Sequence, residues 1–449
     1  MSGARISDGH GGPDPDGAAE SRWSEWVEQA CGEVEASGQW RAPRTFDALG
    51  PSGLLGGVTA TGGGAGQSEP VVSFASNDYL GLASHPAVVA AAHEALDRWG
   101  SGSGASRLVT GTRPVHVALE SELAAWKRCE QAVVFPTGFA ANLSVLSVFA
   151  AEGAKVFSDE LNHASIIDGC RLSRSGVTVY PHGDLGSLDA ALARSAARPI
   201  IVSDTVFSMD GDSVDIEGLV DMAGRHRALL VLDEAHAVLG PELPERVVGA
   251  GRRPKGRPPV DILRLGTLSK TLGSLGGFVA GPRRFIELLV NRARPYIFTT
   301  APTPADSAAA LAALGIVRSA EGDALRSRLA GLVERVAAAV GTGGHGSPII
   351  PLVIGDEADA VAASAGLLAQ GLWVPAIRPP TVPAGTSRLR ITLSSIHTDR
   401  QVDGLLQSLE GLGLGPTVPG STTGGRPVPP ATPEAATGSS KRMGAGSAP

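Results

Sequence analysis

The chain has 449 residues, 43% of them hydrophobic and 18% charged, which is ample material for a folded core. Its formal net charge of −7 argues against nucleic acid as a partner. It has no apolar run of about eighteen residues and no apolar leader, so we expect no membrane partner and a cytoplasmic location. Cys31, Cys129 and Cys170 are widely spaced without a CxxC pair, so we expect neither a disulfide framework nor a metal site.

Composition and texture divide the chain into parts. Both ends are rich in Gly and Pro and lack hydrophobic periodicity, which is typical of disordered tails. A Gly-rich patch, Gly50–Gln67, is expected to form a loop within the N-terminal segment. The expected parts are a tail (residues 1–22), an N-terminal segment (23–75), a large domain (76–300), a smaller C-terminal domain (301–414) and a second tail (415–449).

From Ala132 onward, short apolar runs alternate with segments of helical period. This pattern predicts βαβ units and an α/β fold with a mainly parallel sheet. The expected strands of the large domain are Ala132–Phe135, Lys155–Ser158, Pro199–Ser203, Leu229–Leu232 and Ile262–Leu265. In the smaller domain we expect helices at Ala305–Ser319 and Gly322–Val340 and strands at Ile349–Ile354 and Leu389–Leu393.

Polar residues follow several of these strands. Asp204 comes after one strand, Asp233-Glu-Ala-His236 after the next, and a Gly-rich stretch containing Lys270 after the strand that follows. Because open parallel sheets bind ligands beyond the carboxyl ends of their strands, we expect these side chains to converge in one crevice. This convergence indicates an enzyme.

Lys270 is unusual among the five lysines, because it alone follows a strand and precedes a Gly-rich turn. Its neighbours are small or apolar, which would desolvate the amine, lower its pKa and make the neutral form available. An ordinary surface charge is the alternative. Such a lysine suits a Schiff base, either with a carbonyl substrate or with pyridoxal phosphate.

Pyridoxal phosphate needs a carboxylate beside its ring nitrogen, and Asp233 at a strand end is suited to that position. His236 could bond the phenolic oxygen of the ring. The same four residues also occur in helicases, but those require an upstream phosphate loop with a Gly-Lys dipeptide, which this chain lacks. A helix cap is a second alternative for Asp233, but it does not explain Lys270.

The remaining features of such a site are also represented. The amides near Gly138, at the start of an expected helix, and the hydroxyls of Thr267 and Ser269 suit a phosphate. His163 could stack on the ring, and a structural histidine is equally compatible with its sequence. Arg390, on the closing strand, could hold a substrate carboxylate with two hydrogen bonds, with an ordinary surface arginine as the alternative.

Six motifs together resemble the α-oxoamine synthases, pyridoxal phosphate enzymes of the fold-type I, aminotransferase-like class. The resemblance runs from about Trp23 to Leu414. The motifs are Ser76-Asn-Asp-Tyr-Leu-Gly-Leu82, Gly102-Ser-Gly-Ala-Ser-Arg107, Thr137-Gly-Phe-Ala-Ala-Asn142, Phe207-Ser-Met-Asp-Gly-Asp212, Asp233-Glu-Ala-His236 and Gly266-Thr-Leu-Ser-Lys270.

The resemblance implies roles for residues that match the motifs. Lys270, His163 and Asp233 would be the catalytic residues, with Lys270 binding the cofactor covalently. A homodimer with shared sites is implied, in which Thr299 and Thr300 reach the partner's phosphate. Asp204 stands where the family often has Glu. The residues that would contact the cofactor are Gly138, Phe139, His163, Asp204, Ser208, Asp233, His236, Thr267, Lys270, Thr299 and Thr300.

Within the family, the stretch Arg378–Arg390 is most similar to members that condense L-alanine with a pimeloyl thioester, with loss of carbon dioxide, in biotin biosynthesis. The resemblance then assigns substrate binding to Asn77 and Arg390 at the amino acid and to Thr381 and Arg41 at the acyl chain. The segment before Arg41 departs from the family's usual pattern.

Several alternatives stay open from the sequence. The acyl carrier is coenzyme A or an acyl carrier protein. Other members of the family use glycine with acetyl or succinyl coenzyme A, or act in secondary metabolism. A non-catalytic protein that keeps the fold is the alternative of a different class, and the intact set of Lys270, Asp233 and His236 argues against it.

Overall fold

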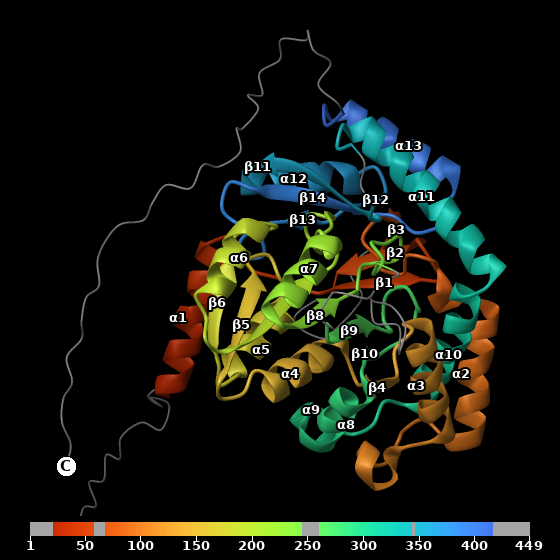
Figure 1. The fold of residues 1–449 in the computed structure, drawn as a ribbon. Helices are drawn as coiled ribbons and strands as arrows, with labels where there is room; N and C mark the ends of the chain where they lie inside the picture. Colours follow the sequence, from red (N-terminus) through yellow and green to blue (C-terminus); the bar gives the residue numbers. More distant parts are fainter. Residues whose placement is uncertain (1–20, 58–67, 245–259, 344–345, 416–449) are drawn as a thin grey trace, which may run out of the picture. The chain divides into compact units, whose positions relative to one another are not determined.

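The computed structural model describes residues 21–57, 68–244, 260–343 and 346–415 (Figure 1). The expected tails, residues 1–22 and 415–449, lie outside the described residues except for positions 21, 22 and 415. Arg22 opens a helix rather than continuing a tail.

A seven-stranded sheet forms the centre of the described chain, in the order β4-β10-β9-β8-β7-β5-β6. Strands β9, β8, β7, β5 and β6 run parallel, whereas β10 is antiparallel to both β4 and β9. The predicted α/β fold with a mainly parallel sheet is therefore confirmed. The strands are β4 (Gln131–Phe135), β5 (Ala154–Asp159), β6 (Gly176–Tyr180), β7 (Arg198–Asp204), β8 (Leu229–Asp233), β9 (Ile262–Thr267) and β10 (Gly277–Gly281).

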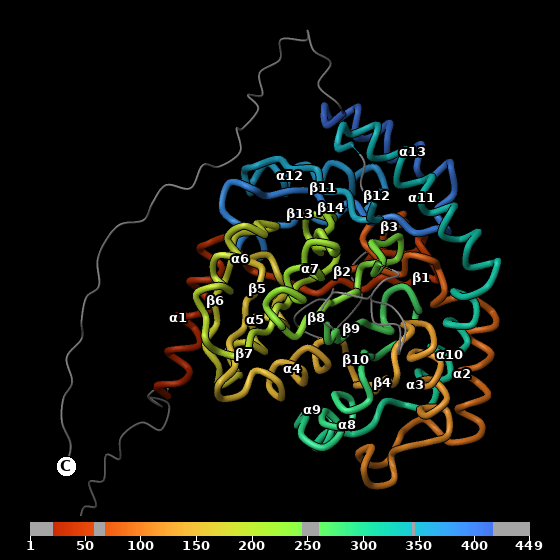
Figure 2. The backbone as a smooth tube through the Cα atoms, viewed as in Figure 1, coloured from red at the N-terminus to blue at the C-terminus, as the bar shows by residue number. Residues whose placement is uncertain are grey.

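Successive strand residues point to opposite sides of the sheet, so the apolar strands present apolar side chains on both faces. Helices cover both of these faces. Val133 of β4 packs with α4 and α8, while its neighbour Val134 belongs to the cluster formed with α3 and α10. Figure 2 follows the alternation of strand and helix from β4 to β8. The helices of this region are α2 (Pro86–Trp99), α3 (Pro114–Trp126), α4 (Gly138–Phe149), α5 (Ala164–Leu172), α6 (Leu185–Ala193), α7 (Ile216–His226), α8 (Arg283–Arg292), α9 (Arg294–Ile297) and α10 (Pro304–Val317).

The N-terminal segment contributes a second sheet of order β1-β2-β3-β12. The expectation of a loop over Gly50–Gln67 is wrong for residues 52–57, which form β2; glycines are tolerated there because the antiparallel partners β1 and β3 supply the hydrogen bonds. Residues 58–67 lie outside the described chain. The elements are α1 (Arg22–Ala36), β1 (Arg44–Ala48), β2 (Ser52–Gly57), β3 (Glu69–Ser73) and the short turns η1 (Leu82–Ser84) and η2 (Arg107–Gly111).

The C-terminal part forms a three-stranded sheet of order β11-β14-β13, and its short strand β12 joins β3 of the N-terminal sheet. The long helices α11 and α13 lie side by side (Figure 1). A domain boundary near residue 300 stays a prediction. The elements are α11 (Ala320–Val340), β11 (Ile349–Gly355), α12 (Glu357–Leu368), β12 (Leu372–Trp373), β13 (Ala376–Ile377), β14 (Ser387–Thr392) and α13 (Asp399–Gly411).

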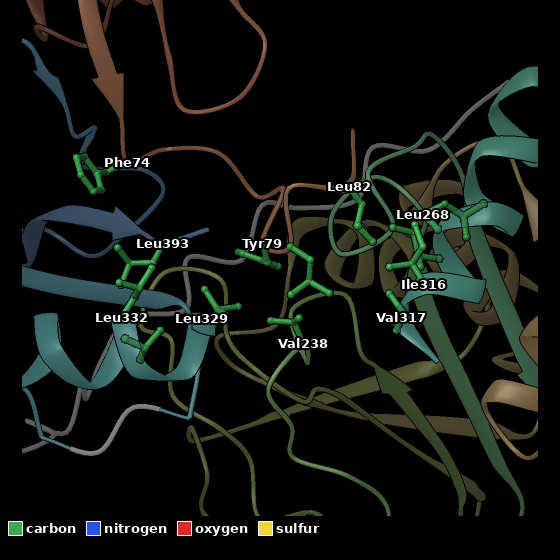
Figure 3. Packing of buried hydrophobic residues seen from close by; sticks show 14 of the residues in the cluster. Phe74, Tyr79, Leu82, Val238, Leu268, Ile316, Val317, Leu329, Leu332 and Leu393 are labelled. Carbon is green, nitrogen blue, oxygen red and sulfur yellow. The ribbon is translucent and has the colours of Figure 1, made fainter. Parts of the chain in front are cut away.

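The largest buried cluster joins residues that are distant in sequence. Figure 3 shows Phe74 and Tyr79 among side chains of α11, with Leu82 and Leu268 on the other side. The loop after β9 is thereby packed against the segment 74–82. This contact brings the Ser76–Leu82 motif next to the loop that carries Lys270. No helix in the described ranges is long and apolar enough to cross a membrane.

Candidate active site

Asp233 ends β8 and is a register partner of Asp204 at the end of β7. Its carboxylate is buried and accepts two hydrogen bonds, from the Asn142 side-chain amide to Oδ2 at 2.6 Å and from the Ala235 backbone N–H to Oδ1 at 2.9 Å. These two donors fix the plane of the carboxylate at the carboxyl edge of the sheet.

Lys270 lies in the loop after β9, and its Nζ is 2.8 Å from Nε2 of His236. Burial lowers the pKa of Lys270 from its ordinary value, against the opposing effect of the Asp233 and Asp204 charges. Burial also lowers the pKa of His236 well below its ordinary value, with the Lys270 charge acting in the same direction. A neutral imidazole and an amine that readily loses its proton therefore face each other, as the small and apolar neighbours of Lys270 predicted.

His163 precedes α5 and is held from two sides. Its backbone N–H donates to Oδ2 of Asp204 at 2.7 Å, and its Nδ1 lies 2.7 Å from the Ser165 hydroxyl. Burial and the Asp233 charge raise the pKa of Asp204 well above its ordinary value. Asp204 thus contacts the backbone of His163, and a side chain one methylene shorter than Glu suffices for this contact.

Asn142 and Ser165 join these groups but were not among the predicted site residues. The Asn142 amide donates to Ser165 Oγ at 2.9 Å as well as to Asp233. Both residues are buried. The available signal was Asn142 itself, an amide on a largely apolar helix, at the end of the Thr137–Asn142 motif.

The start of α4 and the loop after β9 form a tight cradle. A Cβ on Gly138 would meet Thr267 Cβ at 3.3 Å, and one on Gly277 would meet the Gly138 amide nitrogen at 2.5 Å. The Thr267 and Ser269 hydroxyls are 2.6 Å apart, and Phe139 is exposed at the helix start. This close approach places the backbone amides at the start of α4 and the Ser269 hydroxyl where an anion can bind, while the Thr267 hydroxyl donates to the Gly276 carbonyl at 3.0 Å.

Arg390 on β14 reaches the same region. It is buried, and its Nε donates to the carbonyl of Ser208 at 2.6 Å. A second nitrogen donates to Asn77 Oδ1 at 3.3 Å and a third to Thr392 Oγ1 at 2.8 Å. Ser208 and Asn77, from two separate motifs, thus meet at the guanidinium.

Four predicted residues lie outside this cluster of contacts. Thr299 and Thr300 follow α9 beside η2, where the next amide, that of Ala301, donates to the carbonyl of Ala105. Arg41 and Thr381 are exposed. Arg378 donates to the carbonyl of Gly38, so the two segments that carry Arg41 and Thr381 are in contact. The roles of all four residues stay predictions.

The donor set fits pyridoxal phosphate. Lys270 supplies an amine with a lowered pKa, Asp233 a buried carboxylate, His236 a neutral imidazole, and the α4 cradle a place for the phosphate. Among the described residues, no group of three or more His, Cys, Asp or Glu side chains could hold a metal ion.

Residues 69–409 match the family model described as aminotransferase class I and II, and the chain belongs to this family. This membership confirms the class indicated by the motifs.

Curated relatives show which enzymes of this family the chain resembles. The chain is 46% identical over 385 residues to the 8-amino-7-oxononanoate synthase of Burkholderia mallei (strain SAVP1), a match that covers 83% of this chain and 94% of the relative. It is 50% identical over 341 residues to the 8-amino-7-oxononanoate synthase of Burkholderia thailandensis, covering 73% and 85% of the two chains.

Solved structures share the fold. A serine palmitoyltransferase from Sphingomonas wittichii matches with a TM-score of 0.75 and 31% identity, over 88% of this chain and 97% of that one. A variant of the enzyme from S. paucimobilis, with a bound PLP–myriocin aldimine, gives a TM-score of 0.76 and 28% identity over 88% and 98%. The 8-amino-7-oxononanoate synthase of Francisella tularensis gives 0.62 and 25% over 76% and 98%.

Proposed function

We propose that this chain is a pyridoxal phosphate-dependent acyltransferase that carries out the reaction of the 8-amino-7-oxononanoate synthases, a step of biotin biosynthesis. It would condense L-alanine with a pimeloyl thioester and release carbon dioxide and the free thiol. The observation that carries the choice of reaction is the 46% identity to such a synthase over 83% of this chain, against 31% or less for the serine palmitoyltransferases.

When bound, pyridoxal phosphate draws electrons from the α-carbon of an attached amino acid. The Asp233 carboxylate, fixed by Asn142 and Ala235, would keep a proton on the ring nitrogen and so sustain that withdrawal. Lys270 Nζ would first hold the cofactor and, once alanine has replaced it, take the α-proton. Its lowered pKa supports this second role, because a base must be unprotonated to act.

The other side chains would orient the two substrates. Arg390 and Asn77 would bind the alanine carboxylate, and His163 would stack on the ring. As the α-carbon attacks the thioester, the C–S bond breaks and the thiol leaves; loss of the carboxylate as carbon dioxide and reprotonation then give the amino ketone. Thr381 and Arg41 would contact the acyl chain, which is supported by the Arg378–Gly38 contact between their segments.

A homodimer with shared sites is part of this proposal. Apolar side chains are exposed beside η2 and α9, with Val109 at 73%, Phe298 at 70% and Leu108 at 54%. Thr299 and Thr300 follow directly in the chain. A second copy seated on this surface would bury the three apolar side chains and bring these two hydroxyls toward its phosphate site.

The test is a matrix of amino acids against acyl thioesters, with carbon dioxide and free thiol both measured. The arms are L-alanine, glycine and L-serine against pimeloyl, acetyl, succinyl and palmitoyl coenzyme A, plus pimeloyl carried by acyl carrier protein. We expect the highest kcat/KM for alanine with a pimeloyl thioester. Because one methyl group is worth only about 1–3 kcal/mol, discrimination against glycine should be roughly 10–200-fold.

Each other outcome has a clear meaning. A higher kcat/KM for glycine with acetyl or succinyl coenzyme A, or for serine with palmitoyl coenzyme A, would overturn the proposed reaction and keep the family. Failure to release carbon dioxide with any pair would overturn decarboxylative condensation altogether.

A further inference from the structure

Tyr79 is a buried tyrosine with no role in the mechanism above. It is fully buried, and Figure 3 shows it within the apolar cluster between Leu82 and the side chains of α11. Its hydroxyl oxygen lies 2.5 Å from Nδ1 of His236 and 3.2 Å from Oδ1 of Asn77. Burying a hydroxyl among apolar side chains lowers the stability of the fold unless the hydroxyl is hydrogen-bonded. The two partners of the Tyr79 hydroxyl therefore indicate what it does.

The Tyr79 hydroxyl has a single proton, which it can donate either to Asn77 Oδ1 or to His236 Nδ1. Its much shorter contact is with His236 Nδ1. Nδ1 is then the acceptor, and in a neutral imidazole the proton must be on Nε2.

The far side of the His236 ring agrees with this assignment. Nε2 faces Lys270 Nζ at 2.8 Å, and once the amine has lost its proton its lone pair can accept one hydrogen bond from Nε2–H. With the Tyr79 proton on the shorter contact, donation runs from Tyr79 through His236 to Lys270. In the reversed tautomer Nδ1–H would donate to Tyr79, the Tyr79 proton would go to Asn77 Oδ1 across the longer contact of 3.2 Å, and Nε2 would accept from Lys270.

The backbone around Tyr79 is held firmly enough to impose such an orientation. The Tyr79 carbonyl accepts from the Ser395 amide at 2.8 Å. The carboxylate of the preceding residue, Asp78, accepts from the amides of Leu82 and Ala83. A side chain fixed in this way can set the tautomer of its neighbour rather than adapt to it.

We propose that Tyr79 is a positioning residue that holds His236 in its Nε2–H tautomer. The Nε2–H donor then points to the position that Lys270 Nζ occupies. The purpose of that donor rests on the proposed function, since it would serve the phenolic oxygen of bound pyridoxal phosphate. The tautomer itself can be measured without any substrate.

The experiment is ¹⁵N NMR of the histidine ring nitrogens in the full-length enzyme, with and without pyridoxal phosphate. His236→Asn identifies the His236 signals among those of the ten histidines. We expect Nδ1 of the wild type to show the shift of an acceptor and Nε2 that of a protonated nitrogen, in both forms. In Tyr79→Phe the two nitrogens should move toward the averaged shifts of a mixed population.

Tyr180→Phe is the matched control, because Tyr180 is also buried and its strand β6 lies at the far edge of the central sheet. It should leave the His236 signals unchanged. A wild-type Nδ1–H tautomer would overturn the proposal even if Tyr79→Phe fails to fold. An unchanged tautomer in a folded Tyr79→Phe variant would overturn it as well.

Cofactor affinity supplies a second readout. The loss of one oriented donor should weaken pyridoxal phosphate binding by about tenfold in Tyr79→Phe, measured by equilibrium dialysis, with no change in Tyr180→Phe. Equal affinity in the Tyr79 variant would contradict the stated purpose of the donor. If the substrate matrix fails while the tautomer changes as expected, the proposed reaction is wrong and the inference about Tyr79 stands.

Discussion

The Asn142 side chain donates to Oδ2 of Asp233 across 2.6 Å, and this contact joins α4 to the end of β8. The same amide donates to Ser165, which lies beside the His163 ring nitrogen. The orientation of the carboxylate and that of the imidazole are therefore linked through one buried amide. The charge of Asp233 and the hydrogen bond that orients it can therefore be tested by separate substitutions.

Asp233→Asn should keep the cofactor bound but slow removal of the alanine α-proton roughly a thousandfold, about 4 kcal/mol, because a neutral amide no longer holds a proton on the ring nitrogen. The measurement is exchange of the α-proton of L-alanine in deuterated water. Asn142→Ala leaves the carboxylate charged but less well oriented, so a loss of about tenfold is expected. Asp233→Asn within tenfold of wild type would mean that another acid does this work.

Lys270→Ala should abolish turnover and the visible absorption of the lysine-bound cofactor while leaving the fold intact. Lys155→Ala, on β5, is the control and should retain both. Because burial lowers the pKa of Lys270, the neutral amine forms at a lower pH than in an exposed lysine. The rate at which wild-type apoenzyme captures pyridoxal phosphate should therefore reach its plateau at a lower pH than an exposed lysine, with its ordinary pKa of 10.5, would give. Turnover by Lys270→Ala at the wild-type rate would remove this residue from the mechanism.

Arg390→Ala should raise the KM for L-alanine far more than the KM for the thioester, because its contact would be to the amino acid alone. Arg390→Lys keeps the charge but lacks the planar fork, so it should recover only part of the loss. Steady-state kinetics with each substrate varied in turn gives both constants. Equal increases in the two KM values would indicate that Arg390 supports the site as a whole.

His182 links two carboxylates outside the site. Its Nδ1 is 2.9 Å from Asp159 and its Nε2 is 2.7 Å from Asp212; the hydrogen bonds to Asp159 and then Asp212 raise its pKa to about 10. A pKa raised above the unfolded value of 6.5 stabilises the fold fully below about pH 6.5, and this contribution is lost as pH rises through about 10.

His182→Asn should therefore lower the free energy of unfolding at pH 6 by about 2 kcal/mol, between the values for exposed and buried ion pairs. The difference from wild type should shrink by pH 10.5. Urea unfolding at the two pH values measures it, with His93→Asn, an exposed histidine on α2, as control. A difference that is the same at both pH values would exclude a charged His182.

The surface formed by Leu108, Val109 and Phe298 should be a dimer contact. Val109→Asp would place a charge in that contact, so it should shift the protein to monomers and reduce activity. Val353→Asp, at a comparably exposed position on β11, should change neither property. Sedimentation velocity at several concentrations measures the association. A fully active wild-type monomer would contradict the proposed shared sites.

Several features could be predicted from the sequence because their signals are local. The apolar runs that became β4, β5, β7, β8 and β9 stand out from polar flanks, and the small residues around Lys270 already indicate a desolvated amine. Strand β10 could not be found in this way. Its glycine-bounded segment is a strand because it pairs with both β4 and β9.

The tertiary structure alone decided which polar groups meet. Asp233, Asn142 and Ser165 come from three elements, and nothing in their spacing along the chain indicates that one amide serves both a carboxylate and a hydroxyl. Tyr79 belongs to a motif that was recognised, yet its contact with His236 spans 157 positions. Hydrophobic pattern and residue chemistry are properties of short sequence segments, so the sequence determined the fold class and indicated the reacting lysine. Hydrogen-bond direction depends on distances between residues that come together only when the apolar clusters pack.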